Sequence, residues 1–315
     1  MIGFLHEHAE YADLIRTVAQ NMEIAPDLIE KDYWIMHCLH GLQEQGYRFE
    51  LKGGTSLSKG FGIIHRFSED IDIRIEPGDA EQVYTGRNHD KPKHCESRKA
   101  FYDRLANEIA IPGVVSVVRD EEFDDIRYRS GGIRLYYGNH HAVSTGLKEG
   151  ILLELGFDTV TPNEKVTISS WALDFAREHG MEVLDNRAVD AACYHPGYTF
   201  VEKLQTIATK YRRQQETGDM PVNFLRHYYD VYCLLDNELI TGFIGTEEYR
   251  QHKERRFPAA DKLVPVSEND AFVLSDVLTR EQYQKSYEST SALYYRGQPA
   301  FEEVLGRIAQ YLPEL

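Results

Sequence analysis

The sequence predicts an α+β fold in which a sheet-forming half precedes a helical half. Segments with strand character lie before about residue 170, and the clearest is Asp70–Glu76, where charged and apolar residues alternate strictly. Apolar residues recur at helical spacing after about Asn186. Strands followed by helices favour two domains, which we expect at residues 1–185 and 186–315.

The expected elements follow in order along the chain. Apolar residues at helical spacing predict two N-terminal helices, and the second begins at Pro26, because proline suits the first turn of a helix. A strand over 47–51 runs into a glycine pair and then into a short helix over 55–61. Residues 77–97 are polar and typical of a loop. Further strands are expected over 114–119, 133–137, 150–157 and 166–169, and further helices over 97–109, 200–215, 223–235 and 301–312.

Composition and cysteine spacing indicate a cytoplasmic protein. No apolar run approaches the ~20 residues that cross a bilayer, and residues 1–10 lack the basic and apolar regions of a signal peptide. The four cysteines are far apart and form no Cys-x-x-Cys pair, so neither a zinc site nor a disulfide framework is expected. We therefore expect reduced thiols and no membrane partner.

Asp70 and Asp72 carry the clearest chemical signal. One residue separates them on an expected strand, so both side chains leave the same face. At about 6 Å apart and an effective dielectric constant near 20, two such charges repel by about 3 kcal/mol. A divalent cation removes this repulsion, and hard carboxylate oxygens suit Mg²⁺ or Mn²⁺. Both aspartates are therefore candidate metal ligands.

A glycine-rich turn precedes these carboxylates. Gly53-Gly54-Thr55-Ser56 lies between an expected strand and an expected helix. Glycine lets the backbone approach a ligand closely, and N–H groups at a helix start can hold an anion such as a triphosphate. A Walker A loop is excluded, because counting from Gly53 puts Ser58 where its second glycine belongs. Either motif alone is compatible with an ordinary turn or a solvated strand face, whereas the combination favours phosphoryl or nucleotidyl transfer.

Glu154 is the candidate third carboxylate. It interrupts Ile151–Phe157, an otherwise apolar segment that we expect to form a central strand. An unpaired buried glutamate is costly, so a metal or a catalytic role would explain it. The alternative is a buried ion pair with one of the many arginines.

The motifs Gly53–Leu57 and Arg66–Asp72 together resemble those of the AbiEii/AbiGii family, the nucleotidyltransferase toxins of type IV abortive-infection systems. The resemblance extends from about residue 28 to the C-terminus. It implies a polymerase-beta-like nucleotidyltransferase domain with a mixed sheet, followed by a helical C-terminal domain. Shorter matches are Glu30–Trp34, Phe200–Leu204, Arg226–Asp230 and His252–Lys253.

The resemblance also implies roles for individual residues. Asp70 and Asp72 would bind the metal, and Lys203 and Asp230 match later family positions needed for activity. An ammonium at Lys203 can neutralise a phosphate, whereas a solvated helix lysine is the alternative. Asp230 lies four residues after Arg226, so a simple helix ion pair is its alternative. The nucleotide-binding set is Gly53, Gly54, Thr55, Ser56, Ser68 and Lys203.

Basic residues in the helical half suggest where RNA would bind. The formal net charge of -16 argues against a broad basic field, but it is compatible with a local patch. Tyr249 and Phe257 lie beside one basic cluster, and aromatic rings next to arginines can stack on unpaired bases. A solvated helix face is an equal alternative. The candidate RNA-binding residues are Lys210, Arg212, Arg213, Arg255 and Arg256.

The leading interpretation is an enzyme that transfers a nucleoside monophosphate from an NTP to an RNA 3′ end. Family members are thought to modify the acceptor end of tRNA and to have a separately encoded antitoxin as partner. Such an enzyme would use Mg²⁺ or Mn²⁺, and Glu154 could orient or deprotonate the attacking hydroxyl. A second interpretation keeps the site but makes a protein hydroxyl or a small molecule the acceptor. A third is a binding module with a relic fold, against which the intact carboxylates count.

Overall fold

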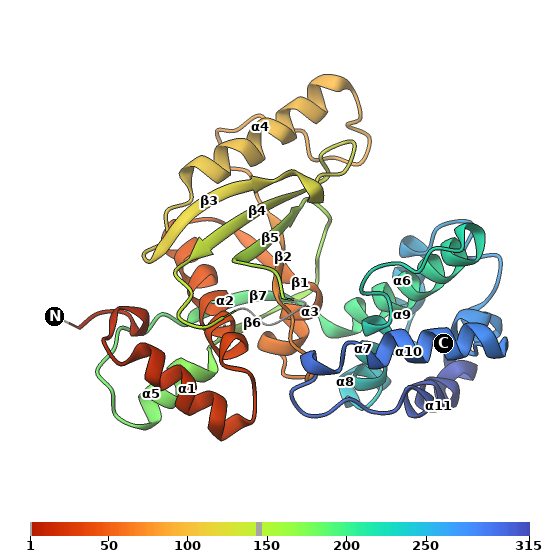
Figure 1. Ribbon diagram of the computed structural model, residues 1–315. Helices are drawn as coiled ribbons and strands as arrows, with labels where there is room; N and C mark the ends of the chain where they lie inside the picture. The colour runs from red at the N-terminus through yellow and green to blue at the C-terminus, as the bar shows by residue number, and fades with distance from the viewer. Residues whose placement is uncertain (1, 143–146) are drawn as a thin grey trace. The chain divides into compact units, whose positions relative to one another are not determined.

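The computed structural model describes residues 2–142 and 147–315, and the chain divides into two compact units (Figure 1). The sheet unit comprises Met1–Gly60 and Ser68–Tyr194. The helical unit comprises Phe61–Phe67 and His195–Leu315. A short segment from the first half of the sequence therefore belongs to the helical unit.

Within the described residues, the sheet unit contains one mixed seven-stranded sheet with the order β3-β4-β5-β2-β1-β7-β6. β2 pairs in parallel with β5, and β1 pairs in parallel with β7, while the other neighbours are antiparallel. The predicted α+β class with a mixed sheet is confirmed. The strands are β1 (Phe49–Lys52), β2 (Asp70–Ile75), β3 (Val114–Asp120), β4 (Ser130–Tyr137), β5 (Ile151–Gly156), β6 (Asn163–Ile168) and β7 (Ala188–Tyr194).

Helices surround the sheet in the first unit and make up most of the second. In the sheet unit, α3 continues directly into a π-helical turn at Ser56–Gly60. Figure 1 shows α4 lying across β3 and β4, which it contacts. The helices of the sheet unit are α1 (Tyr11–Met22), α2 (Pro26–Glu44), α3 (Gly53–Thr55), α4 (Pro92–Glu108) and α5 (Trp171–Glu178). Those of the helical unit are α6 (Pro196–Thr217), α7 (Arg226–Leu234), α8 (Glu238–Thr241), α9 (Glu247–Arg256), α10 (Val277–Glu288) and α11 (Phe301–Tyr311).

The alternation of β2 separates an apolar face of the sheet from a polar one. Ile71, Ile73 and Ile75 are buried, whereas the residues between them are partly exposed. Tyr102 of α4 lies against Gly131 of β4, on the side of the sheet that carries the buried isoleucines. One face therefore belongs to the core, and the other presents charged side chains.

Two sequence-based expectations need correction, and one helix was not predicted. The helical region was expected to begin at about Asn186 but begins at Pro196, because Ala188–Tyr194 forms β7. Its small residues have little intrinsic strand preference, but pairing with β1 and β6 fixes their conformation. The expected loop over 77–97 was too long, since α4 begins at Pro92. Helix α5 was not predicted from the sequence.

Helix α2 passes through the sheet unit and buries three consecutive charged residues. Glu30 accepts a hydrogen bond from the backbone N–H of His140 at 3.0 Å. Lys31 pairs with Glu69 at 3.2 Å, and Asp32 pairs with Lys59 at 2.6 Å. Successive residues of a helix point about 100° apart, so the three charges reach three different segments. α2 thereby fixes the segments that flank the charged face of the sheet.

None of the helices in the described ranges is both long enough and apolar enough to span a bilayer.

Candidate functional site

Asp70 and Asp72 lie on one face of β2, as their spacing predicted. The side chain of Asp70 is 14% exposed, and Asp72 is half-buried. The hydroxyl of Thr55 donates a hydrogen bond to the backbone carbonyl of Asp70 at 2.5 Å. The start of β2 is thus tied to the glycine-rich turn.

Glu154 shares this face from the neighbouring strand. It is in register with Asp72 across the parallel β2–β5 pair, and adjacent strands lie about 4.8 Å apart. β5 lies between β4 and β2, so the expected central strand is confirmed. On the other side of β2, Lys52 is in register with Asp72. One row of the sheet therefore carries a lysine, an aspartate and a glutamate.

The glycine-rich turn approaches Asp72 so closely that a side chain would not fit. Gly53 has φ +70°, and a Cβ built on it would lie 2.3 Å from Oδ2 of Asp72. Thr55 and Ser56 are fully buried, so their hydroxyls face the interior. Cys193 is a neighbour of Ser56, and burial raises the pKa of its thiol to about 12. Any contact of this turn with a phosphate would therefore come from its backbone.

A divalent cation fits the donors on β2. No cluster of three or more histidine, cysteine, aspartate or glutamate side chains suited to a metal occurs among the residues that the structure describes. Mg²⁺ does not need one, because it is commonly bound by one or two carboxylates together with substrate phosphates and water. The close approach of the Gly53 backbone to Asp72 and the paired hard oxygens of Asp70 and Asp72 match that kind of site.

Lys148 is a cation beside this site that the sequence analysis missed. Its ammonium lies 3.9 Å from Oδ2 of Asp70. No local sequence pattern connects Lys148 with Asp70, because 78 residues separate them. They come together only because β5, which follows Lys148, pairs with β2.

The helical unit holds a second charged cluster around Asp230, which is fully buried on α7. Arg66 binds both carboxylate oxygens, with distances of 2.6 and 2.7 Å, and the ammonium of Lys203 on α6 lies 2.9 Å away. Although burial alone would raise the pKa of Asp230, the Arg66 and Lys203 cations hold it well below its usual range. Burial lowers the pKa of Lys203, which Asp230 opposes. Lys203 is thus buried in an ion pair, and the alternative interpretation of a solvated helix lysine was wrong.

Arg66 is the member of this cluster that sequence reasoning missed. It lies 164 residues before Asp230 and is held by the backbone of the helical unit, where it bridges to Tyr294. The next residue, Phe67, donates its N–H to Leu293 at 2.7 Å. The segment that leads into β2 is therefore anchored in the helical unit, and both Lys203 and Asp230 belong to that unit as well.

The predicted RNA-binding residues have different environments. Arg213 and Arg255 are exposed. Arg212 pairs with Asp261 at 2.7 Å, and Arg256 pairs with Glu202 at 3.3 Å. Burial lowers the pKa of Lys210 to about 8.

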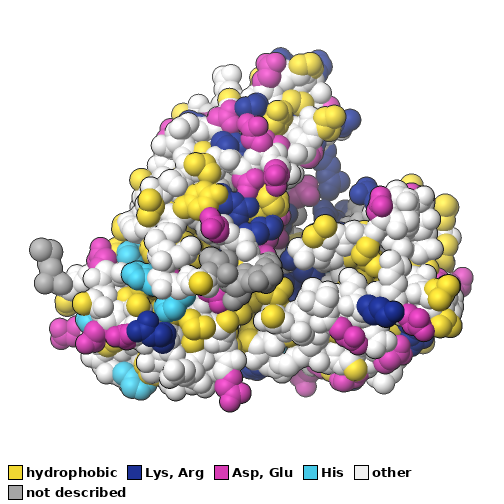
Figure 2. Space-filling view, in the orientation of Figure 1, with side chains coloured by type: hydrophobic (Ala, Val, Ile, Leu, Met, Phe, Trp, Pro, Cys, Tyr) yellow, Lys and Arg dark blue, Asp and Glu magenta, His cyan; other side chains and the backbone are white. Residues whose placement is uncertain are grey.

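The aromatic side chains expected to stack on bases are inside the protein. Tyr249 and Phe257 are 3% and 6% exposed, so neither offers a face to a base, and that expectation was wrong. Acidic and basic side chains are interspersed on the face drawn in Figure 2. The exposed Arg213 and Arg255 remain the candidates for contact with a phosphate backbone.

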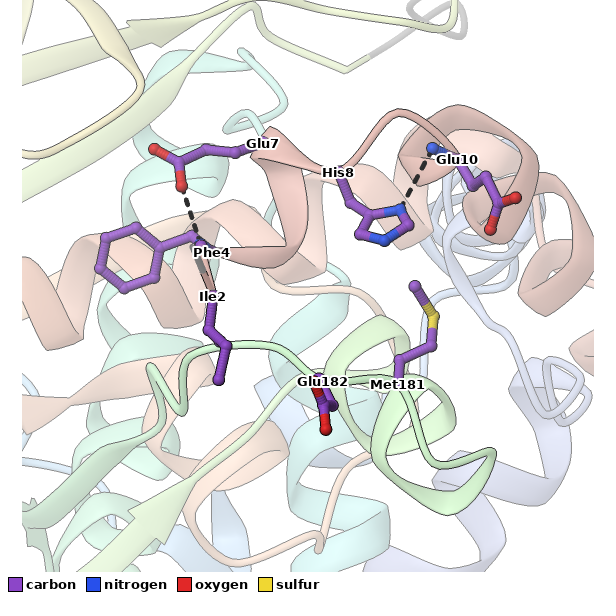
Figure 3. Close-up of a pocket in the computed structure, with 8 residues that line it drawn as sticks. Ile2, Phe4, Glu7, His8, Glu10, Met181 and Glu182 are labelled. Atoms are coloured by element: carbon purple, nitrogen blue, oxygen red, sulfur yellow. Dashed lines mark hydrogen bonds between the residues drawn. The ribbon is translucent and has the colours of Figure 1, made fainter.

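A large cavity in the sheet unit contains none of the predicted site residues. Its volume is about 600 Å³, and it lies between the N-terminal segment and the loop after α5 (Figure 3). Glu7, Glu10 and Glu182 line it together with His8. In Figure 3 the Glu7 carboxylate binds the backbone N–H of Phe4, at 2.9 Å. An acidic lining of this kind does not suit a nucleotide.

We predict that Asp230→Asn lowers the free energy of unfolding at pH 7 by about 3 kcal/mol or more, because it leaves two buried cations without their anion. The native pKa of Asp230 is depressed, so its stabilisation is present above the ordinary carboxyl pKa and is lost as pH falls below it. The difference from the wild type should therefore shrink below about pH 4. Urea unfolding at several pH values measures this.

Asp13→Asn is the matched control, since Asp13 forms an exposed ion pair with Arg16 on α1. Its effect should stay within about 0.5 kcal/mol. If Asp230→Asn had an equally small effect, the cluster would not stabilise the helical unit.

Comparison with known proteins identifies the family. The model of one family, described as nucleotidyl transferase AbiEii toxin, type IV TA system, matches residues 37–307. This range includes the glycine-rich turn, the three carboxylates and the Arg66 cluster. No curated protein matches the chain. Membership implies an NTP substrate and an antitoxin partner. The chain belongs to the AbiEii family, the nucleotidyl transferase toxins of type IV toxin–antitoxin systems.

Proposed function

We propose that the chain transfers a nucleoside monophosphate from an NTP to the 3′ end of an RNA, with tRNA as the acceptor. The observation that carries this proposal is the charged face of the sheet. Asp70 and Asp72 lie side by side on it, Glu154 is in register with Asp72, and the backbone of Gly53 lies directly against the Asp72 carboxylate.

The reaction breaks a phosphoanhydride bond of the NTP and forms a phosphate ester bond to the acceptor. The 3′-oxygen of the acceptor loses its proton and bonds to the α-phosphorus of the NTP, while the bond from that phosphorus to the β-phosphate oxygen breaks and pyrophosphate leaves. Asp70 and Asp72 would hold Mg²⁺ or Mn²⁺. When bound, the ion offsets charge on the phosphates and lowers the pKa of the attacking hydroxyl.

The residues of the sheet unit have distinct roles in this proposal. Glu154 orients the acceptor hydroxyl or takes its proton, as a positioned carboxylate can. Backbone N–H groups of Gly53 and Gly54 contact the triphosphate, since glycine allows a close approach. The buried Thr55 positions β2 through its bond to Asp70, with Ser56 packed beside it. The predicted contact of Ser68 with the nucleotide stays part of the proposal.

The cluster in the helical unit supplies positive charge. Arg66 and Lys203 carry two cations against the single anion of Asp230, so the cluster is formally positive. A cluster of this sign attracts phosphate groups. Lys203 keeps its proposed role in nucleotide use as an expectation from the family, and Asp230 holds its ammonium in place.

We predict that labelled NTP will be incorporated into RNA of tRNA size when the full chain is mixed with magnesium, each NTP in turn and total RNA. Asp70→Asn and Asp72→Asn should each lower the rate by more than about a hundredfold, because each removes one metal-binding charge. Resolving RNA and protein separately identifies the acceptor. Expression without an antitoxin should slow growth, and Asp72→Asn should restore it.

Asp219→Asn, at an exposed aspartate of the helical unit, is the control and should react like the wild type. Label in protein alone would mean that the acceptor is a protein and not an RNA, while the proposed nucleotidyl transfer would stand. Near wild-type rates in Asp70→Asn or Asp72→Asn would refute the mechanism. No label with any NTP would refute the proposed reaction.

A separate prediction concerns the RNA surface. Arg213→Glu and Arg255→Glu should weaken RNA use and leave the KM for NTP unchanged, because both side chains are exposed on helices of the helical unit. Each change should reduce the steepness of the plot of log RNA affinity against log salt concentration by about 1, as expected for one lost phosphate contact. Arg16→Glu, at an exposed arginine of α1, is the control. An equal loss in the control would mean that net charge alone explains the effect.

A further inference from the structure

Lys148 has an unusual setting, in which its backbone is clamped by a buried ion pair. The Lys31 ammonium donates to the carbonyl oxygen of Lys148 at 2.6 Å, and Glu69 accepts the backbone N–H of Lys148 at 3.1 Å. Lys31 and Glu69 also bind each other at 3.2 Å, and their side chains are 4% and 11% exposed. The three residues form a closed network that joins the Lys31 ammonium, the Glu69 carboxylate and both backbone polar groups of Lys148.

This clamp links Lys148 to the metal-binding strand. Glu69 immediately precedes Asp70, so the group that holds Lys148 is joined by one peptide bond to a proposed metal ligand. Lys31 comes from α2 in the interior of the unit. Burial lowers the pKa of Lys31, and Glu69 opposes that effect. The position of Lys148 relative to Asp70 is therefore fixed by buried charges, not by a surface contact.

The side chain of Lys148, in contrast, is accessible. It is 39% exposed, and its ammonium lies 3.9 Å from Oδ2 of Asp70. The ammonium also lies 4.8 Å from the ring centroid of Phe123, which limits the directions open to a flexible lysine. A solvent-accessible cation is thus held beside Asp70, one of the two carboxylates on the charged face of β2.

We propose that Lys148 binds the triphosphate of the NTP at the site formed by Asp70 and Asp72. This inference rests on the proposed function. A cation that neutralises Asp70 would also displace the Lys148 ammonium, which can then pair with phosphate oxygens that arrive at the same place. Lys31 and Glu69 act as positioning residues, because they touch the backbone of Lys148.

The alternative role for Lys148 is to neutralise Asp70 in the metal-free protein and nothing more. The two roles predict the same result for the metal alone. Lys148→Ala should tighten the binding of Mn²⁺ without nucleotide in either case, because a competing cation is gone. The two roles predict different effects of Lys148→Ala on nucleotide binding, since only a lysine that contacts the phosphates contributes to the affinity for the nucleotide.

The test is calorimetric titration of the full chain with α,β-methylene NTP analogues in the presence of magnesium. Lys148→Ala should weaken the binding of the analogue by about tenfold or more, and Lys148→Arg should retain most of the affinity because it keeps the charge. The affinities of the variants for inorganic tripolyphosphate should follow the same order, since Lys148 contacts the phosphates and not the nucleoside. Lys165→Ala, at an exposed lysine on β6 of the same unit, is the matched control and should bind like the wild type.

The outcomes separate this inference from the proposed function. If the wild type binds the analogues and Lys148→Ala binds them equally well, Lys148 is only a counter-ion and the inference is wrong. If the wild type binds none of the four analogues, the proposed function fails, and this inference fails with it. Thermal unfolding of each variant checks that lost affinity does not reflect a lost fold.

Discussion

Electrostatic repulsion between Asp70 and Asp72 is the constraint on which the site depends. Strand geometry gives both carboxylates the same face of β2, and Glu154 adds a third negative charge from β5. Such an arrangement is unfavourable without cations nearby, and the structure supplies Lys52 in register and Lys148 at 3.9 Å from Asp70. Neighbouring lysines and a glycine backbone that lies close to the carboxylates suit a site for a divalent cation and a polyphosphate.

Buried charges in α2 keep the flanking segments in place. Asp32 binds Lys59 at the end of the π-helical turn that follows Gly53, and Lys31 binds Glu69 at the start of β2. A buried pair is costly to form, and it is far more costly to break, because one charge would remain without a partner. The two segments that carry Gly53 and Asp70 are therefore attached to the same helix, which fixes them relative to each other.

The sequence predicted the parts of the site that depend on local spacing. The alternation around Asp70 and Asp72 identified the strand and its charged face, and Glu154 in an apolar run marked a central strand. The clusters Arg66–Asp230 and Lys31–Glu69 were not predictable, because their partners lie 164 and 38 residues apart and no periodicity connects them. β7 was not predicted because its small residues have little intrinsic strand propensity. Pairing with the neighbouring strands determines their extended conformation.

Direct measurement of metal binding tests the central claim, that the paired carboxylates of β2 recruit a divalent cation. Titration of the full chain with Mn²⁺, followed by the electron paramagnetic resonance signal of the free ion, gives the affinity without any turnover. The account predicts that Asp70→Asn and Asp72→Asn each weaken Mn²⁺ binding by about tenfold or more, while Asp219→Asn leaves it unchanged. Equal affinity in the wild type and in both β2 variants would contradict it.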